Sequence, residues 1–163
     1  MQMPCLECGA TVPRSSASTA SPRQLASGQL KPGDCLQGPG LNLGTTNPLP
    51  EYYNVVPCTQ QHIAEVFFAD NAWPTALAYP GDNKLDSQAD ARCSTAFRTY
   101  DGIDNSQSAV NYDYSYPADI TWANGDRGLL CIAYRPTQQY PGGAPVNYSI
   151  RGIPIRGRRG LEL

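Results

Sequence analysis

With 163 residues, 40% of them hydrophobic and 16% charged, the chain is long enough for one ordinary domain and too short for two separate cores. Its apolar runs fall far short of the roughly 20 residues that cross a bilayer, and its first residues lack the pattern of a secretory signal peptide, so neither feature is expected. The net charge of −2 hides an asymmetry, because residues 1–31 carry +2 and residues 151–163 carry +3 around a centre of −7.

The first half of the chain predicts an extended arm followed by three strands. Residues 9–32 are small, polar and interrupted by proline, so residues 1–32 are interpreted as an arm or linker that is ordered only where something holds it. Short strands are predicted at residues 34–36 and 52–56, the second rich in β-branched and aromatic residues. The segment IAEVFFADN, residues 63–71, is apolar on both faces and predicts a central strand.

The second half predicts one long helix, two more strands and a late one. A helix is predicted from Asp82, a natural N-cap, to a stop at Gly102. Its apolar stripe consists of Leu85, Ala89, Cys93, Ala96, Phe97 and Tyr100. Tyrosines alternate with polar residues over residues 112–116, which predicts a strand whose tyrosines face the core. Residues 129–134 predict a strand that is apolar on both faces. The pattern also allows a late strand at residues 146–150. Beyond residue 135 the chain is Pro/Gly-rich and then basic, which predicts a second arm over residues 136–163.

Six cysteines fall into two sets. The widely spaced Cys35, Cys58, Cys93 and Cys131 predict two disulfides, although four buried thiols are the alternative and four cysteines allow three pairings. Pairing of Cys35 with Cys58 is favoured because antiparallel strands would place them opposite each other. Pairing of Cys93 with Cys131 is favoured because the helix stripe faces a strand beneath it. Cys5 and Cys8 form half of a zinc knuckle without a second half, so a surface disulfide or a remnant of a zinc ribbon is favoured over bound metal.

Candidates for chemistry are few. His62 is the single histidine, so any Ser-His-Asp or Cys-His site would have to use it, and a disulfide at Cys58 would remove the nearest nucleophile. Asp82, Asp86 and Asp90 share one helical face, which is more often a solvated face than a cation site. Nucleotide-binding and hydrolase motifs are missing from the sequence. No catalytic residue, metal or cofactor is therefore predicted.

Interaction residues are a more promising class than catalytic ones. Basic ends on an acidic body favour contacts between copies or with an acidic surface. The alternative is that the arginines only keep the two ends of the chain solvated. Arginines without interleaved aromatics do not predict nucleic-acid binding. Amphipathic rings anchor protein contacts, although they are more often core. The candidate interaction residues are His62, Trp73, Trp122, Arg156, Arg158 and Arg159.

An ordered series of motifs resembles the septum-formation domain of actinobacteria over about residues 33–135. The series is GDC at residues 33–35, VVPC at 55–58, His62 with AEV at 64–66, a helix carrying Cys93, YSYP at 114–117, and WANGDR at 122–127 before Cys131. The resemblance implies an extracytoplasmic, disulfide-bearing α+β module and does not imply an enzyme. Family members carry a membrane anchor, whereas this sequence reaches the domain through a polar arm, which suggests either a truncated or reassigned form of the sequence or reuse of the module without a membrane span.

Together these observations predict an α+β domain over residues 33–135, with a mostly antiparallel sheet, one main helix, two disulfides and extended arms on both sides. The main functional hypothesis is a non-catalytic structural module on the exterior of a large assembly, such as a decoration protein of an actinobacterial phage virion. Its partners would be other subunits, held through the arms. The first alternative is an envelope protein that binds a septal or cell-wall partner outside the cytoplasm. The second alternative is a wall-acting hydrolase that uses His62.

Overall fold

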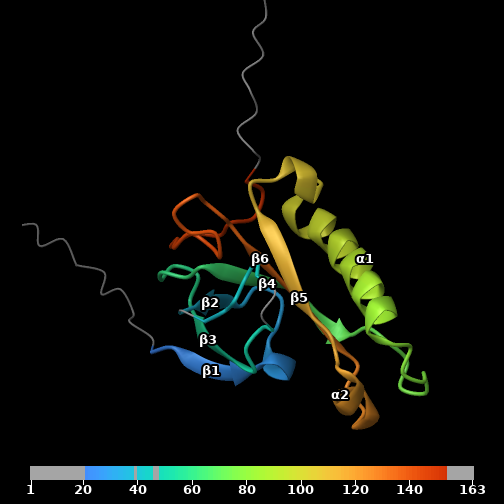
Figure 1. Cartoon of the computed structure of the whole chain (residues 1–163). Coiled ribbons are helices and arrows are strands. Elements are labelled where there is room, and N and C mark those ends of the chain that lie inside the picture. Colours follow the sequence, from blue (N-terminus) through green and yellow to red (C-terminus); the bar gives the residue numbers. More distant parts are fainter. Residues whose placement is uncertain (1–20, 39, 46–47, 154–163) are drawn as a thin grey trace, which may run out of the picture.

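The fold is a six-stranded antiparallel sheet with one long helix packed on it, the α+β class predicted from the sequence (Figure 1). The computed structural model describes residues 21–38, 40–45 and 48–153. The elements are β1 (Arg23–Ala26), the 3-10 helix η1 (Ser27–Gln29), β2 (Cys35–Gln37), β3 (Tyr52–Val56), β4 (Ala64–Asn71), α1 (Asp82–Asp101), the 3-10 helix η2 (Asn105–Gln107), β5 (Asn111–Ser115), α2 (Asp119–Ala123) and β6 (Gly128–Tyr134). The strand order is β1-β3-β2-β4-β6-β5.

Two segments differ from the sequence-based expectation. Residues 23–26, expected to belong to an arm, form the edge strand β1, because this segment pairs antiparallel with β3 from Arg23 opposite Val55 to Ala26 opposite Tyr52. The late strand expected at residues 146–150 is reduced to one bridge between His62 and Val146. Residues 1–20, with Cys5 and Cys8, and residues 154–163 lie outside the described residues.

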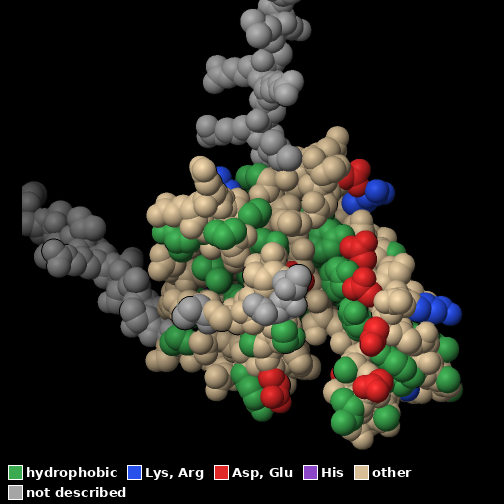
Figure 2. Space-filling model, viewed as in Figure 1, with side chains coloured by type: hydrophobic (Ala, Val, Ile, Leu, Met, Phe, Trp, Pro, Cys, Tyr) green, Lys and Arg blue, Asp and Glu red, His purple; other side chains and the backbone are tan. Residues whose placement is uncertain are grey.

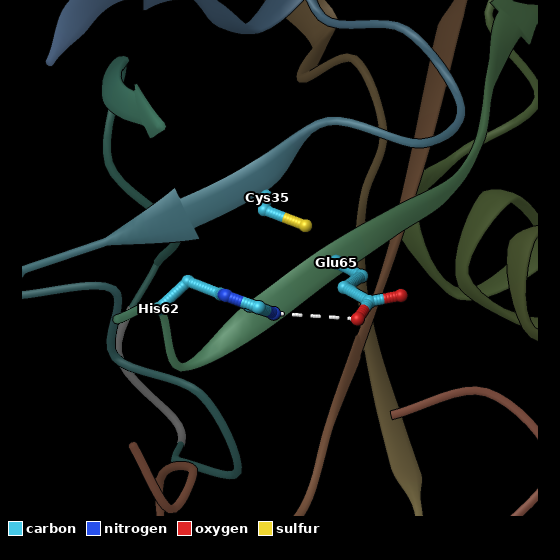
Figure 3. Close-up of side chains that lie close together, drawn as sticks. All are labelled: Cys35, His62 and Glu65. Carbon is cyan, nitrogen blue, oxygen red and sulfur yellow. Dashed lines mark hydrogen bonds and ion pairs between the residues drawn. The ribbon is translucent and has the colours of Figure 1, made fainter. Parts of the chain in front are cut away.

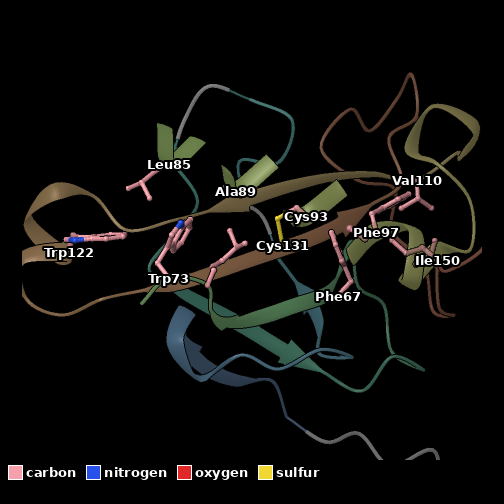
Figure 4. Packing of buried hydrophobic residues seen from close by; sticks show 14 residues of the cluster. Phe67, Trp73, Leu85, Ala89, Cys93, Phe97, Val110, Trp122, Cys131 and Ile150 are labelled. Atoms are coloured by element: carbon pink, nitrogen blue, oxygen red, sulfur yellow. A yellow bond between two sulfur atoms is a disulfide. The ribbon is translucent and has the colours of Figure 1, made fainter. Parts of the chain in front are cut away.

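Helix α1 forms because its apolar stripe has a sheet to cover. Leu85, Ala89, Cys93 and Phe97 are all 0% exposed and pack against one face of the sheet (Figure 4). The helix ends at Gly102, whose φ of 83° is the left-handed conformation that favours glycine. At the other end Gly81 is the N-cap and Asp82 is the first helical residue, so the helix begins one position earlier than predicted.

A second apolar cluster lies on the opposite face of the sheet. It includes Leu36, Tyr53, Val66 and Ile132, and it is covered by side chains from the segment between β2 and β3, such as Leu43. Both faces of the central strands β4 and β6 are thus buried, as their two-sided apolar sequences predict.

Two disulfides join the elements. Cys35 at the start of β2 is bonded to Cys58 just after β3, and Cys93 of α1 is bonded to Cys131 of β6. Their Cα–Cα distances are 5.3 and 5.8 Å, within the usual range for this bond. This is the pairing that the sequence favours.

Residues 144–153, here called the C-terminal strap, return along the sheet. Backbone hydrogen bonds connect Val146 with His62 in both directions, at 2.8 and 2.9 Å. Ile153 accepts a bond of 2.8 Å from the Ala109 N–H, just before β5. The strap therefore runs from the start of β4 to the start of β5. Among the described residues, no helix is both long and apolar enough to cross a bilayer.

Candidate functional site

The histidine lies in a buried polar network rather than at a surface. His62 precedes β4 and is 0% exposed, and Glu65 in β4 is 4% exposed. The His62 Nε2 lies 3.3 Å from Glu65 Oε1 (Figure 3), and Nδ1 lies 2.9 Å from the Gln60 carbonyl oxygen. Both ring nitrogens therefore face acceptors, an arrangement that only the doubly protonated imidazolium satisfies.

Glu65 collects donors from three parts of the chain. Besides His62, its carboxylate accepts hydrogen bonds from the Tyr100 hydroxyl of α1 at 2.6 Å and from the strap at the Ser149 hydroxyl and the Ile150 N–H, at 3.0 and 2.8 Å. One buried carboxylate thus joins β4, α1 and the C-terminal strap.

The pKa values of this pair move in the direction of the charged forms. Desolvation by burial opposes both charges, but hydrogen bonds to Glu65 and the Gln60 carbonyl raise the pKa of His62 above its usual value. Burial likewise opposes the Glu65 carboxylate, but the donors on His62, Tyr100, Ile150 and Ser149 lower its pKa. Both shifts favour the charged forms, so the surroundings of the two side chains support a buried His62–Glu65 ion pair.

The same cluster resembles a metal site in position but not in chemistry. Ligand-type atoms of Cys35, His62 and Glu65 lie within 4.8 Å of one another (Figure 3). The Cys35 sulfur is bonded to Cys58 and offers no thiolate, and both nitrogens of His62 lie against oxygen acceptors of the protein. Buried and fully engaged, His62 has the environment of a residue that holds structure.

The two tryptophans also lie in the interior. Trp73 is 5% exposed and Trp122 is 4% exposed, and their rings are 5.9 Å apart (Figure 4). With His62, three of the expected interaction residues are thus buried, and the other three, Arg156, Arg158 and Arg159, lie outside the described residues. Trp122 also donates a hydrogen bond of 3.0 Å from its indole nitrogen to the carbonyl oxygen of Leu77, in the loop that follows β4.

Arg127, which sequence reasoning did not single out, organises this loop. The side chain is buried at 6% exposure, with its guanidinium 3.9 Å from the centre of the Trp122 ring. It donates hydrogen bonds to the carbonyl oxygens of Pro74, Thr75, Leu77, Trp122 and Asp126. Arg127 thereby ties residues 74–77 to α2 and the turn before β6. These segments, residues 74–77 and 117–127, are called the α2 lobe below.

An open cleft lies between the α2 lobe and the opposite half of the sheet. Figure 2 shows it as a notch at the lower edge of the molecule, between η1 and α2 as placed in Figure 1. Its volume is about 550 Å³. One wall comes from η1 and residues 49–51, and the other comes from residues 116–121 and Asp126. The floor is formed by the last residues of β4 and β5 and the first residues of β6. We call it the end cleft.

The end cleft combines an apolar floor with an acidic rim. Leu30 and Leu130 of the second apolar cluster reach its surface, beside the partly buried Leu49 and Ala69. Glu51, Asp70 and Asp126 are exposed at the cleft, and none of the described residues lining it is Lys, Arg or His. Sequence reasoning missed this site because its walls come from distant segments that share no motif.

The carboxylates predicted on one face of α1 accept hydrogen bonds from tyrosine hydroxyls, two of which lie on the neighbouring strand β5. The Tyr112 hydroxyl donates to Asp90 at 2.8 Å and the Tyr114 hydroxyl to Asp86 at 3.1 Å. Asp82 accepts a bond from Tyr79. Burial, and after it the hydrogen bond to Asp90, raises the pKa of the Tyr112 hydroxyl to about 12. These acids therefore hold α1 to the sheet edge at β5.

Comparison with protein families gives one finding. The family model described as septum formation matches residues 5–132, which is more than half of the chain and begins earlier than the resemblance over 33–135. Comparison with curated proteins found no match, and comparison with solved structures found none either.

Proposed function

Because this chain belongs to the septum-formation family, we propose that it is a non-catalytic module that binds a septal or cell-wall partner outside the cytoplasm. The two disulfides suggest an oxidising, extracytoplasmic environment. The proposed binding surface is the end cleft.

The observation that carries the proposal is the contrast between the end cleft and the His62 site. The end cleft is open, and it offers both apolar surface and exposed carboxylates to a ligand. His62 is fully buried and both of its nitrogens are engaged, which disfavours a wall-acting hydrolase that uses it as a base. A binding role therefore fits the available surfaces better than hydrolysis.

A cleft-filling variant tests the binding role. Gly28 lies exposed in the cleft wall, and a Cβ placed on it meets no atom within 4 Å, so Gly28→Trp should fill the cleft without disturbing the fold. Gly28→Ala is the matched control. We expect epitope-tagged wild type and Gly28→Ala to concentrate at the division septum of the source cells, and Gly28→Trp to lose that position.

The outcome against the proposal is equally clear. If folded Gly28→Trp still concentrates at the septum and crosslinks to the same wall components, the end cleft is not the binding surface. Turnover of wall material that is abolished by His62→Ala would replace the binding role with the hydrolase.

The basic ends favour one other placement, the exterior of a large particle such as a phage virion. Density-gradient sedimentation of native source material separates the two placements. Cosedimentation with a particle supports the virion placement, and recovery in envelope fractions supports the septal one.

A further inference from the structure

We propose that the end cleft of one copy binds the Arg-rich segment 154–163 of a second copy, so that the protein associates head to tail. This inference rests on the end cleft being the binding surface proposed above, and it identifies the septal partner in the cleft as a second copy of this chain. Three observations support the head-to-tail contact: the chemistry of the cleft, the charge of the segment and the place where the segment leaves the domain.

The end cleft lacks internal neutralisation. Within the described part of the chain, the ion pairs are His62–Glu65 and Arg98–Asp104, and neither involves Glu51, Asp70 or Asp126. Asp70 and Asp126 each use one oxygen to accept a backbone N–H, of Asn71 at 2.7 Å and Gly128 at 2.8 Å. These bonds orient the Asp70 carboxylate at the end of β4 and the Asp126 carboxylate just before β6, and they use only one oxygen of each.

Residues 154–163 have the complementary chemistry. The segment carries Arg156, Arg158 and Arg159 against one glutamate, with Ile155 and Leu161 on either side of the arginines. Arginine packs its aliphatic stem on apolar surface while its guanidinium donates to carboxylates. The apolar floor and acidic rim of the end cleft match this alternation of apolar and cationic side chains.

The position of the segment favours a second copy over the same molecule. Ile153, the last described residue, is bonded to Ala109 at the start of β5. Ser115 at the end of β5 and the residues after it line the cleft, so the segment leaves the domain at the opposite end of this strand. Donor and acceptor at opposite ends make a heterologous contact, which adds copies in series instead of closing as a symmetric pair.

Sedimentation equilibrium of the full oxidised chain tests the association. At low salt the average mass should rise above 17.6 kDa as the protein concentration increases. In about 0.5 M NaCl it should return toward the monomer, because exposed ion pairs are screened. A mass that stays at the monomer value at every concentration would overturn the proposal, and this is also the result expected if the segment fills its own cleft.

Two variants and their mixture identify the contact. Glu51→Gln with Asp70→Asn removes two of the three acceptor charges, and Arg156→Gln, Arg158→Gln and Arg159→Gln together remove the donor charges. Each variant alone should weaken association at least about tenfold. Their equimolar mixture should form a dimer that grows no further, since one copy supplies an intact segment and the other an intact cleft. The control Asp86→Asn with Asp90→Asn removes the same charge from α1 and should associate like wild type.

Other results separate this inference from the proposed function. If both variants associate like wild type, or if their mixture stays monomeric, the head-to-tail contact is absent. Septal binding that is still lost in Gly28→Trp would then keep the proposed function, with the occupant of the cleft being another protein. Normal septal binding in Gly28→Trp would contradict both the proposed function of the end cleft and the head-to-tail contact.

Discussion

Glu65 shows how one buried carboxylate can join distant parts of a small domain. It receives donors from His62, Tyr100, Ser149 and Ile150, so that the strap and α1 meet at β4. Removing one member of a buried pair leaves the other charge uncompensated. We therefore expect His62→Gln to lower the free energy of unfolding by about 3 kcal/mol in urea titrations. A double variant with Glu65→Gln should cost less than the sum of the singles, and additive costs would show that the two side chains are not coupled.

The same pair predicts a dependence of stability on pH. The raised pKa of His62 adds stability that is complete below its unfolded value of 6.5 and is lost as pH rises through the folded pKa. The lowered pKa of Glu65 adds stability that is complete above 4.5 and is lost as pH falls. The stability difference between wild type and the double variant should therefore be largest between these two values. Thermal unfolding across pH 3–9 measures it, and a pH-independent difference would contradict the ion pair.

Arg127 predicts a local effect on the wall of the end cleft. Arg127→Lys keeps the charge but cannot donate to five carbonyl oxygens, so several buried acceptors lose their partner. We expect a loss of about 2 kcal/mol and faster amide exchange in α2. Arg98→Lys, at a side chain that is 67% exposed, is the matched control and should change neither the stability nor the amide exchange in α2. Unchanged exchange in α2 would show that Trp122 packing alone holds the α2 lobe.

Among the elements, β1 shows why local sequence pattern is insufficient for edge strands. Residues 23–26 have no marked alternation, and only their pairing with β3 makes them a strand. Tyr52–Val56, in contrast, carries β-branched and aromatic residues and is a strand over the predicted residues. The difference arises because a strand obtains its hydrogen bonds from a partner that lies elsewhere in the chain.

The disulfides make a prediction for the elements that they connect. The bond between Cys93 and Cys131 closes the longer loop, with a sequence separation of 38 against 23 for Cys35 and Cys58. Replacing Cys93 and Cys131 by alanine should therefore cost about 4 kcal/mol, and the other pair slightly less. Alkylation in denaturant, read by intact mass, should label the four central cysteines only after reduction. Labelling without reductant would contradict both the bonds and the extracytoplasmic placement.

At the level of the whole molecule, the end cleft exists because the sheet carries separate structures on its two halves. The wall of η1 and residues 49–51 belongs to the β1-β3 side, and the α2 lobe follows β5 at the other edge (Figure 1). The acids that line the cleft come from three different segments.

The sequence by itself determined the features that depend on local periodicity and residue type. The stripe of α1, the two-sided strands β4 and β6, the α+β class and the favoured cysteine pairing could all be predicted, because burial selects apolar residues at regular spacing. Only the tertiary structure decided that His62 and the tryptophans are interior, that Arg127 holds the α2 lobe and that three distant acids share one cleft. These features depend on which segments become neighbours, and that is a property of the packed chain rather than of any local pattern.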